Sequence, residues 1–533
     1  MQLSYEAEAA PAAPVRVAST PPLAFDVAAR RPWPSDVAAI ATCDLPAGQR
    51  LTGPDLVLSE PLLEGHRFLT APIAAGELVT SWGEPFGRAL RPIAAGEWLR
   101  NARALSVLRE RADCGWVQGI QPNFSDHVKP CEVSEDTFRA GEPLPHSRLD
   151  ATFDGFVREA GRGVGTRNYL VLLPLSSRAS AFSRALGRRL RAEAPKEGGL
   201  DGVVAMPHTE DGAAEATAEG GGGGAANNSA LLVRTLLGLL LHPNVGAALV
   251  LQTEEDVAAA AAGRGVCYAD LEQAARAAGR EGALRALSHR VSTLRLLAFD
   301  AELASCAAQA SELLPPLRAA TREPCAASSL VVAQQCGGSD AFSGTHANPL
   351  VGAASKAVVQ AGGTALLAET DELIGAEQYV LQSVADFPTA SKFLHMVRRF
   401  QAYAAEHNTS AEGNPSGGNL YRGLYNIALK SLGAAMKRPP DVRLEKVVEY
   451  SELLPPPAPK GAVGGVAEGE GGGGDRRHGV GTIGPGFCFM DSPGNDLESI
   501  AGQVACGCNL IYFSTGNGSI TNFPFVRRRP LRT

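Results

Sequence analysis

The sequence predicts a multidomain α/β protein in which a small all-β domain precedes two α/β domains. Between residues 32 and 108, short β-type runs alternate with Pro-Ala-Gly and Ala-Ala-Gly-Glu turns, which is typical of a small all-β unit. Farther along the chain, apolar β-type runs lead through loops into helical segments, which is the pattern of α/β units. A chain of 533 residues is long enough for two to four domains, each with its own core.

Composition and charge exclude several classes of protein. Hydrophobic residues make up 45% and charged residues 20% of the chain, as in an ordinary soluble globular protein. A net charge of -7 argues against a nucleic-acid binder, which needs a basic face. No apolar run approaches the roughly 20 residues that span a bilayer. We therefore expect neither a nucleic acid nor a membrane as a partner.

The cysteines and the amino-terminal residues bear on the compartment. Ten scattered cysteines are too few for a disulfide framework in a chain of this length. The amino-terminal residues lack the apolar core of a signal peptide, and Glu6 and Glu8 disfavour a transit peptide. We therefore expect reduced thiols and a cytoplasmic location.

Changes in composition divide the chain into five segments. Its Ala- and Pro-rich start is predicted to be disordered, and a polar, Pro-containing stretch after the β-type region is predicted to be a linker. Two glycine-rich tracts, residues 218–226 and 464–479, are predicted to be insertions in surface loops. The segments are a disordered tail (1–31), a small β domain (32–108), a linker (109–150), an α/β domain (151–325) and a carboxyl-terminal α/β domain (326–533).

The first α/β domain repeats a strand-loop-helix pattern. A strand over residues 169–173 leads into a basic amphipathic helix, and a second buried strand ends near His208. Residues 229–251 then predict a helix followed by a strand. Residues 257–325 are rich in Ala, Arg and Leu at helical spacing, so we expect helices that close the domain.

The stretch from residue 331 to residue 348 is the strongest candidate for a site. It begins as a strand and then breaks at Gly337-Gly338, which permit positive φ and a close approach of the backbone to a ligand. Loops held by a rigid sheet usually carry the chemistry. A thiol, a hydroxyl, a carboxylate and an imidazole lie around this break, on Cys336, Ser339, Asp340 and His346.

This stretch and three others resemble the altronate/galactarate dehydratase family. The four motifs lie at residues 335–349, 361–378, 414–419 and 486–525. The repeated I-A-A-G-E with GEPFGRAL resembles the SAF domain, a small β-clip fold that precedes the catalytic part in this family, and GRGVGTRN resembles its second domain. The resemblance implies a hydro-lyase of sugar acid catabolism that converts a small anionic polyhydroxy carboxylate to a 2-keto-3-deoxy acid. It also implies a divalent metal, Fe(II) or Mn(II), and is compatible with a homo-oligomer.

Three departures from the family pattern keep two alternatives open. Arg100-Asn101-Ala102-Arg103 replaces the family's H-x-H-N, the loops after the second domain's strands lack cysteine, and the chain ends in VRRRPLRT soon after the last motif. A shortened carboxyl-terminal domain is one interpretation of that end. The alternatives are a non-catalytic relative that binds a sugar acid or acts as a scaffold, and a different lyase or hydrolase acting on another hydroxy acid.

Dehydration of a sugar acid needs groups that the sequence supplies. The proton α to the carboxylate is barely acidic, so the enediolate needs a cation or dense hydrogen-bond donors, with a general base and a general acid beside it. We expect catalytic roles for His208, Glu210, Ser339, Asp340 and Glu369. We expect substrate contacts from Arg162, Arg167, Asn168, His346, Asn414, Ser416 and Asn419. The expected metal ligands are Cys336 and His208.

Each of these residue types also has an ordinary structural use. A histidine at a strand end can belong to the core or cap an element, and a buried cysteine is most often a small hydrophobic residue. Carboxylates near a helix start, such as Glu369 and Glu377, are commonly caps or partners of the helix dipole. The polar residues of NPSGGN can form a structural turn, and Arg162 and Arg167 can form interdomain salt bridges.

Overall fold

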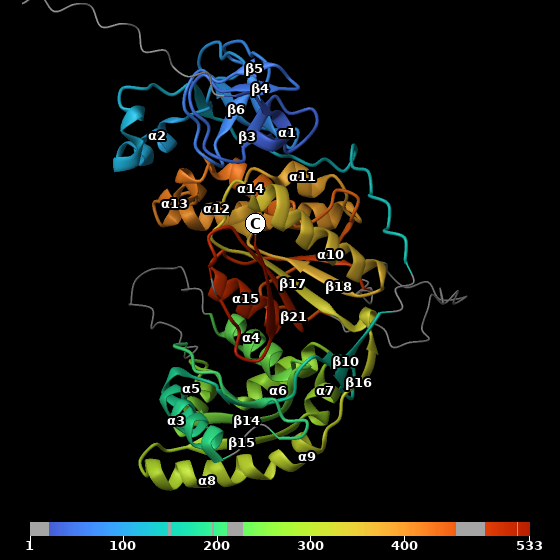
Figure 1. Ribbon diagram of the computed structural model, residues 1–533. Helices are drawn as coiled ribbons and strands as arrows, with labels where there is room; N and C mark the ends of the chain where they lie inside the picture. The colour runs from blue at the N-terminus through green and yellow to red at the C-terminus, as the bar shows by residue number, and fades with distance from the viewer. Residues whose placement is uncertain are drawn as a thin grey trace, which may run out of the picture. The chain divides into compact units, whose positions relative to one another are not determined.

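The computed structural model describes residues 21–147, 151–193, 197–210, 228–454, 485–519 and 521–532. The chain forms two compact units, Met1–Asp126 and His127–Thr533 (Figure 1). The first twenty residues of the predicted tail and both glycine-rich tracts lie outside the described residues. No helix within the described ranges combines the length and the apolar composition that crossing a bilayer requires.

The first unit is built mainly from short strands and confirms the predicted small all-β domain. Its sheets have three strands each, in the orders β1-β4-β5, β2-β3-β6 and β7-β8-β9. The repeated turns contain Gly48, Gly76 and Gly96, whose φ angles of 79°, 83° and 82° are ones that side-chain-bearing residues rarely adopt. The elements are β1 (Leu23–Ala24), α1 (Phe25–Ala28), β2 (Ala29–Arg30), β3 (Ala38–Ala41), β4 (Arg50–Thr52), β5 (Leu56–Val57), β6 (Arg67–Leu69), β7 (Leu78–Ser81), β8 (Glu84–Ala89), α2 (Ala102–Arg109), the 3₁₀ helix η1 (Ala112–Val117) and β9 (Phe124–Asp126).

Regular structure extends beyond the predicted limits of this domain on both sides. The segment predicted to be a tail contains β1, α1 and β2. Its strands are held by pairing, β1 with β4 and β2 with β3. The predicted linker contains η1 and β9, and β9 is held by pairing with β8. Arg100, at the position of the missing H-x-H-N, is 4% exposed, and its Nη1 lies 2.7 Å from Oε2 of Glu60. Its positive charge is therefore paired with Glu60 inside this unit.

The second unit contains two parallel sheets, and the first of them has the order β13-β12-β14-β15. Alternate residues of β12 enter two cores: Leu170 and Leu172 face one, whereas Val171 and Leu173 face the other. The elements are β12 (Tyr169–Pro174), α3 (Ser177–Glu193), β13 (Gly202–Ala205), α4 (Ser229–Leu241), β14 (Val245–Thr253), α5 (Glu254–Ala261), α6 (Tyr268–Ala277), α7 (Glu281–Ala286), β15 (Ser288–Leu294), α8 (Phe299–Glu312) and α9 (Leu314–Ala319).

The prediction that residues 257–325 are helical is wrong for two stretches. β15 interrupts the helices because its seven residues pair in parallel with β14. β16 (Glu323–Ala326) pairs with β10 (Thr152–Val157), which also pairs with β11 (Val164–Gly165). This small antiparallel sheet joins the start and the end of the segment that was predicted to be one α/β domain.

The second parallel sheet has six strands in the order β19-β20-β18-β17-β21-β22. All neighbouring strands are parallel, and β22 pairs with β21, so the last residues of the chain form an edge strand. The elements are β17 (Val331–Cys336), η3 (Ser343–Ala347), α10 (Asn348–Gln360), β18 (Thr364–Leu367), η4 (Thr370–Leu373), α11 (Glu377–Leu381), α12 (Phe387–Glu406), α13 (Gly417–Tyr421), α14 (Ile427–Ala435), β19 (Leu444–Val448), β20 (Phe487–Met490), α15 (Asp496–Ala505), β21 (Leu510–Thr515) and β22 (Arg527–Arg532), with the short 3₁₀ turns η2 (Ala327–Ser329) and η5 (Ala411–Gly413).

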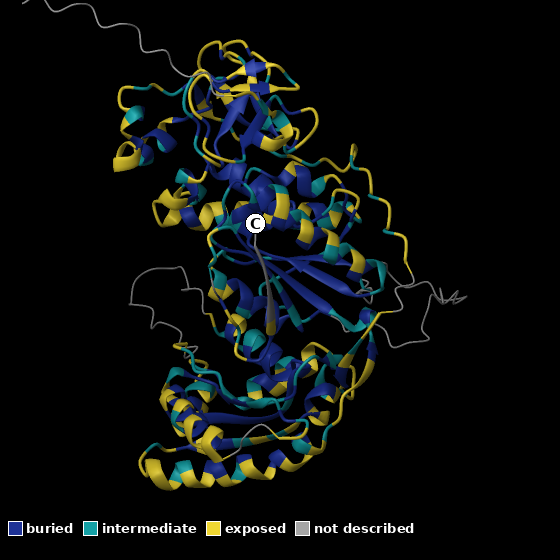
Figure 2. Cartoon of the chain, in the orientation of Figure 1, coloured by how far each residue is buried: buried dark blue, intermediate teal, exposed yellow. Residues whose placement is uncertain are grey.

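One hydrophobic core continues from the first parallel sheet into the second. It includes Val171 and Val250 from one sheet and Ala333 and Phe513 from the other. Between the sheets, α4 packs on α15 so closely that a Cβ on Gly238 would lie 2.2 Å from the carbonyl oxygen of Ala505 (Figure 1). The strands β12, β14, β17, β18 and β20 are mostly buried (Figure 2). The shared core explains why the two predicted α/β domains form a single compact unit.

The helix α14 is buried on every side. All nine residues of α14 are buried, including Lys430. Small and apolar residues cover its whole circumference, so it packs against η3, η4, α10 and α11 at once. A lysine inside such a helix therefore needs a partner.

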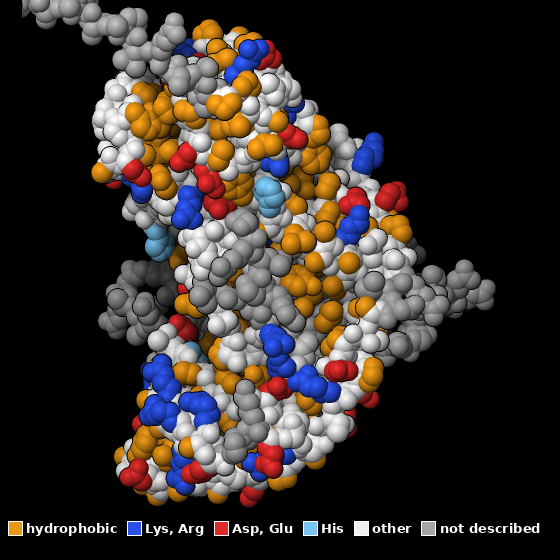
Figure 3. Space-filling view, in the orientation of Figure 1, with side chains coloured by type: hydrophobic (Ala, Val, Ile, Leu, Met, Phe, Trp, Pro, Cys, Tyr) orange, Lys and Arg blue, Asp and Glu red, His pale blue; other side chains and the backbone are white. Residues whose placement is uncertain are grey.

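On the visible surface, acidic and basic side chains are interspersed (Figure 3), in keeping with the modest net charge of -7.

Candidate functional site

The candidate site lies where the strands β17 and β18 end. From β17 the chain passes through α10 to β18 on one side, and β21 pairs on the other side of β17. Such a switch point in a parallel sheet is where ligands usually bind. Cys336 is the last residue of β17, and Glu369 follows β18 by two residues. The 3₁₀ helix η4 then carries Glu372.

Glu369 sits in a backbone conformation that is uncommon for a residue with a side chain. Its φ of 69° and ψ of 64° are left-handed. Its N–H donates to Oγ of Ser492 (3.0 Å), which holds this turn against the loop that follows β20. A positive φ at a charged, fully buried residue marks a position that the surrounding structure maintains against a local cost.

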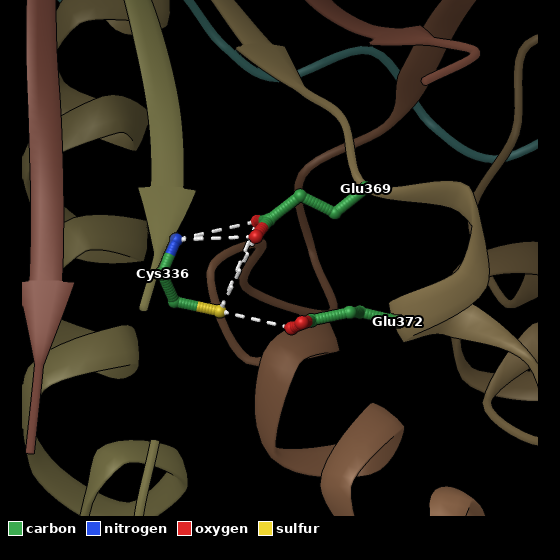
Figure 4. Close-up of side chains that lie close together, drawn as sticks. All are labelled: Cys336, Glu369 and Glu372. Atoms are coloured by element: carbon green, nitrogen blue, oxygen red, sulfur yellow. Dashed lines mark hydrogen bonds between the residues drawn. The ribbon is translucent and has the colours of Figure 1, made fainter. Parts of the chain in front are cut away.

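Three side chains converge at this point (Figure 4). Sγ of Cys336 lies 3.4 Å from Oε2 of Glu372 and 3.8 Å from each carboxylate oxygen of Glu369. The N–H of Cys336 also points to Glu369, with a distance of 3.3 Å between the nitrogen and Oε2. All three residues are buried, with exposed fractions of 5% or less.

Two lysines balance the two carboxylates. Nζ of Lys430 lies 2.7 Å from Oε1 of Glu372 and 2.6 Å from Oδ1 of Asn414. Nζ of Lys437 forms an ion pair with Glu369 and lies 3.1 Å from Sγ of Cys336. The lysines are seven residues apart, on α14 and just after it, so they project to the same side. Two buried lysines therefore lie against two buried carboxyl groups.

Burial and charge act differently on the two carboxyl groups. Burial raises the pKa of Glu369 to about 8, although Lys437 opposes this shift. Burial alone would also raise the pKa of Glu372, but Lys430 and Lys437 together hold it below its ordinary value. Burial raises the pKa of the Cys336 thiol well above its ordinary value, and Glu369 adds to that effect. Opposite shifts on adjacent carboxyl groups are typical of an acid and base pair.

Amide side chains hold the cluster from the side of the sheet. Nε2 of Gln335 donates to Oε1 of Glu369 (2.7 Å) and to Oδ1 of Asp496 (3.0 Å). Nε2 of Gln503, on α15, donates in turn to Oε1 of Gln335 (3.1 Å). Burial raises the pKa of Asp371 to about 6, and Glu372 adds to this shift. The hydrogen bonds of Gln335 and Gln503 link Glu369 to α15.

The same cluster supplies a set of possible metal ligands. One ligand atom from each of Cys336, Glu369 and Glu372 can be chosen so that all three lie within 4.8 Å of one another. One sulfur and two carboxylate oxygens suit a borderline cation better than Mg²⁺ or Ca²⁺, which prefer oxygen alone. The donors therefore fit a divalent transition metal, and Lys437 contacts two of the same three side chains.

The structure brings three of the predicted site residues together. Cys336, Glu369 and Asn414 all belong to the cluster, and Asn414 contacts both Glu372 and Lys430. The motif at residues 414–419 otherwise serves as a helix start. Oγ of Ser416 and the side chain of Asn419 form a capping box for α13.

The other predicted residues near the Gly337-Gly338 break have structural partners. Oδ1 of Asp340 accepts the N–H groups of Phe342 (3.0 Å) and Ser343 (2.8 Å), which is a turn. The carbonyl of Ser339 accepts Nδ2 of Asn419 (2.7 Å). His346 is exposed, and its Nδ1 lies 2.9 Å from Oγ1 of Thr345. The catalytic roles of Ser339 and Asp340 and the substrate contact of His346 stay predictions.

His208 and Glu210 lie at the end of β13 in the other parallel sheet. Nε2 of His208 lies 2.9 Å from the carbonyl oxygen of Pro174, and its N–H contacts Ser180. Glu210 accepts Nδ2 of Asn228 (2.7 Å). Within the described residues, the possible metal ligands beside Cys336 are Glu369 and Glu372, whereas the sequence predicted His208. His208 follows a strand of one sheet and Cys336 ends a strand of the other, and the predicted roles of His208 and Glu210 stay predictions.

Arg162, Arg167 and Asn168 stabilise the start of the second unit's first parallel sheet. Arg162 donates to the carbonyl oxygens of Leu241, His242 and Val245. Nη1 of Arg167 lies 3.7 Å from Oδ1 of Asp201. Nδ2 of Asn168 donates to the carbonyl oxygens of Gly199 and Leu317. These contacts lie at the amino ends of strands, opposite the edge at which the Cys336 cluster lies.

Sequence reasoning missed Glu372, Lys430 and Lys437. Glu372 follows Glu369 by three residues in the same motif, so a short helical turn could have suggested it. The lysines lie seven residues apart in a segment that is otherwise small and apolar. That spacing is two helical turns, and two cations on one side of a buried helix indicate buried acidic partners.

Comparison with known families covers most of the chain. Residues 31–105 match the altronate/galactarate dehydratase SAF domain. Residues 155–265 match the second domain of the D-galactarate dehydratase/altronate hydrolase family, and residues 327–463 and 478–527 match the D-galactarate/altronate dehydratase carboxyl-terminal domain. The candidate site lies in the last of these matches.

Individual relatives are similar at modest identity. Altronate dehydratase of Escherichia coli (strain K12) is 28% identical over 487 residues, which cover 91% of this chain and 83% of that protein. Galactarate dehydratase (L-threo-forming) of the same organism is 27% identical over 480 residues, covering 89% of this chain and 78% of that protein. The (2R)-sulfolactate sulfo-lyase subunit beta of Chromohalobacter salexigens is 28% identical over 379 residues, covering 70% of this chain and 80% of that subunit.

The raised pKa of Glu369 predicts a pH dependence of stability. The folded protein keeps a proton on Glu369 that the unfolded chain, with an ordinary pKa of 4.5, releases. This contribution to the free energy of unfolding is complete below the unfolded pKa and is lost as pH rises through about 8. In Glu369→Gln, urea unfolding with a chelator present should show a smaller fall in that free energy between about pH 5 and 8. The exposed Glu406→Gln is the control, and an unchanged slope in Glu369→Gln would contradict the shift.

The ion pair of Lys437 predicts a large loss of stability on its removal. Lys437→Met leaves Glu369 buried without its cation, so at about pH 9, above the Glu369 pKa of about 8, the free energy of unfolding should fall by about 3–5 kcal/mol. Adding Glu369→Gln to this variant should recover part of the loss, because the unpaired charge is then gone. Lys129→Met, at an exposed position, is the matched control and should change stability little. A loss in Lys437→Met no larger than in the control would show that the pair is dispensable.

Proposed function

The chain belongs to the altronate/galactarate dehydratase family, and on that premise we propose that it is a hydro-lyase that removes water from a sugar acid. The product would be a 2-keto-3-deoxy acid, as the names of its dehydratase relatives suggest for a substrate of this class. The observation that carries the assignment to a site is the cluster of two carboxyl groups, two lysines and one thiol at the switch point of the second sheet.

The groups of the cluster match the demands of the reaction. Glu372 touches the partly exposed Asn414, so it is the carboxylate closer to the surface and the candidate base for the α-proton. In the metal-free cluster, Glu369 is the candidate acid for the departing β-hydroxyl, because its raised pKa keeps a proton on it near neutral pH. Lys430 and Lys437 supply fixed positive charge beside both carboxyl groups, which favours the negative charge that develops on the enediolate.

A metal fits the same side chains. We propose that Cys336, Glu369 and Glu372 would hold a divalent cation, with the sulfur favouring Fe(II) over harder ions and Mn(II) as the second choice. Bound there, it would act as a Lewis acid that polarises the substrate's carboxylate. Around it, Lys437 and Gln335 orient Glu369, and Lys430 orients Glu372. A dication would also favour the thiolate form of Cys336, whose proton burial otherwise retains.

The cysteines support a reducing compartment. All ten are free thiols in the structure. We propose the cytoplasm as the location, because free thiols persist where disulfides are kept reduced. The proposed partner is a small anionic polyhydroxy carboxylate. We also propose a homo-oligomer, as the resemblance to the family allows.

A second candidate function is a sulfo-lyase acting on a sulfonated hydroxy acid. The observation that favours it is the 28% identity to a sulfolactate sulfo-lyase subunit over 70% of this chain. That reaction class would also need a base that removes the weakly acidic α-proton, and a leaving group on the neighbouring carbon. Release of sulfite from sulfolactate, without keto-acid formation from any sugar acid, would select this function over dehydration.

The proposed roles predict which carboxylate is essential. Glu372→Gln should lower kcat/KM for keto-acid formation by at least about 100-fold, because it removes the proposed base and keeps the shape of the side chain. The assay uses a panel of aldonic and aldaric acids, with and without Fe(II). Glu377→Gln is the matched control, since Glu377 is a buried residue of the same motif whose carboxylate accepts the Gly375 N–H. Equal losses in both variants would remove Glu372 from the mechanism. A substrate-induced rise in Tm without any turnover would favour a non-catalytic binding protein.

The proposed ligands predict metal content. Anaerobically purified protein loaded with Fe(II) and desalted should retain iron, and Cys336→Ala should retain much less. His208→Ala should keep its iron, because His208 is held by Pro174 and Ser180 in the other sheet. Cys43→Ala, at an exposed cysteine of the first unit, is the control. Loss of iron in His208→Ala but not in Cys336→Ala would overturn the ligand set.

A further inference from the structure

A cavity lies at the opposite end of the sheet that carries the candidate active site. It is lined by Val331, the first residue of β17, and by Asn509, which precedes β21. Cys336 is the last residue of β17, so the strand separates the two places by roughly 17 Å, at about 3.3 Å per residue. The cavity is closed on the other side by Leu241 and His242 at the end of α4 and by Ala283 of α7.

Arg162 gives this cavity a buried positive charge. It is 9% exposed, and its Nε and Nη2 donate to the carbonyl oxygens of Leu241 (3.2 Å), His242 (2.9 Å) and Val245 (2.5 Å). Nη1, the remaining nitrogen of the guanidinium, has no hydrogen-bond acceptor among the residues that the structure describes. Burial lowers the pKa of Arg162 to about 9, and Arg158 adds to that shift, which is the sign of a cation with no anion beside it.

Arg280 supplies a second cation, and His242 does not supply a third. Nη2 of Arg280 donates to the carbonyl oxygen of Leu454 (3.0 Å), and Nη1 lies 3.4 Å from the carbonyl oxygen of Gly161. Both ring nitrogens of His242 are engaged, Nε2 with the carbonyl of Cys508 and Nδ1 with the N–H of Asn244. Burial lowers the pKa of His242 to about 3, so its ring is neutral.

No carboxylate balances the two arginines among the described residues that line the cavity. The lining is otherwise mainly apolar, and a charged group buried without a counter-ion is costly. The lining residues are Gly161, Arg162, Gly163, Val164, Leu241, His242, Pro243, Arg280, Ala283, Ser329, Val331, Leu453, Leu454, Cys506, Gly507 and Asn509.

We propose that this cavity binds a small carboxylate with a short hydrocarbon chain, at a site separate from the Cys336 cluster. The carboxylate would accept hydrogen bonds from Nη1 of Arg162 and from Arg280, in the forked geometry that guanidinium groups favour. Its hydrocarbon part would lie against Leu241, Val331 and Leu453. A cavity between two packed sheets, with apolar walls and few convergent polar groups, is an ordinary place for such a ligand.

Calorimetric titration of the full chain with sodium propionate and with inorganic phosphate tests this site. Propionate should bind the native protein, and phosphate should bind at least tenfold more weakly because it has no apolar part. Arg280→Met should weaken propionate at least tenfold, because Arg280 is half of the proposed clamp. Arg276→Met, on the neighbouring helix α6 and outside the cavity, should leave the affinity unchanged. Unchanged urea unfolding midpoints would show that both variants fold.

Three results would overturn the proposal. An unchanged propionate affinity in Arg280→Met would show that propionate binds at the Cys336 cluster or elsewhere. Phosphate bound as tightly as propionate would remove the role of the apolar walls. A propionate methyl signal that receives no saturation transfer from the native protein would show that the cavity takes no such ligand. None of these outcomes depends on whether the chain dehydrates sugar acids.

Discussion

The candidate active site depends on the neutralisation of two buried carboxyl groups by two buried lysines. Glu369 and Glu372 stand where two parallel strands end, and neither could remain charged there without Lys437 and Lys430. The lysines are held in place because α14 is buried on every side and cannot turn them to solvent. Asymmetry between the pairs then sets the chemistry: Glu372 is shifted toward the charged form and Glu369 toward the protonated form. The same balance keeps Cys336 as a thiol until a stronger cation competes for it.

The fold gives opposite electrostatic conditions to the two ends of β17. At its carboxyl end, each lysine is in contact with a carboxyl group. At its amino end, Arg162 and Arg280 face a cavity in whose described lining there is no acid. The shared core between the parallel sheets keeps both ends in fixed geometry, because α4 and α15 meet with no room for a side chain at Gly238. One strand therefore connects a site suited to proton transfer with a cavity suited to an anion.

Sequence reasoning found part of the candidate site, and the reason lies in what a motif can report. Cys336 and Glu369 end consecutive strands, and strand ends in a parallel sheet meet, so both could be predicted from the order of elements. Ser339, Asp340 and His346 are close to Cys336 in the chain. Asp340 nevertheless forms a turn, the carbonyl of Ser339 accepts a hydrogen bond from Asn419, and His346 pairs with Thr345 at the surface. Proximity along the chain after a strand therefore did not indicate which side chains turn back toward the sheet. His208 was expected beside Cys336, but it ends a strand in the other sheet.

The amino-acid sequence by itself determined the order of domains, the alternation of strands and helices, the glycine turns of the first unit and the family to which the chain belongs. These properties follow from local patterns of apolar residues and turn residues, which act over a few positions. The tertiary structure alone decided that Lys430 and Lys437 are the partners of Glu372 and Glu369, that residues 288–294 form a strand, and that Arg162 lines a cavity. Each of these outcomes depends on segments far apart in the chain, and the charge state of a buried side chain is set by whichever distant groups packing brings against it.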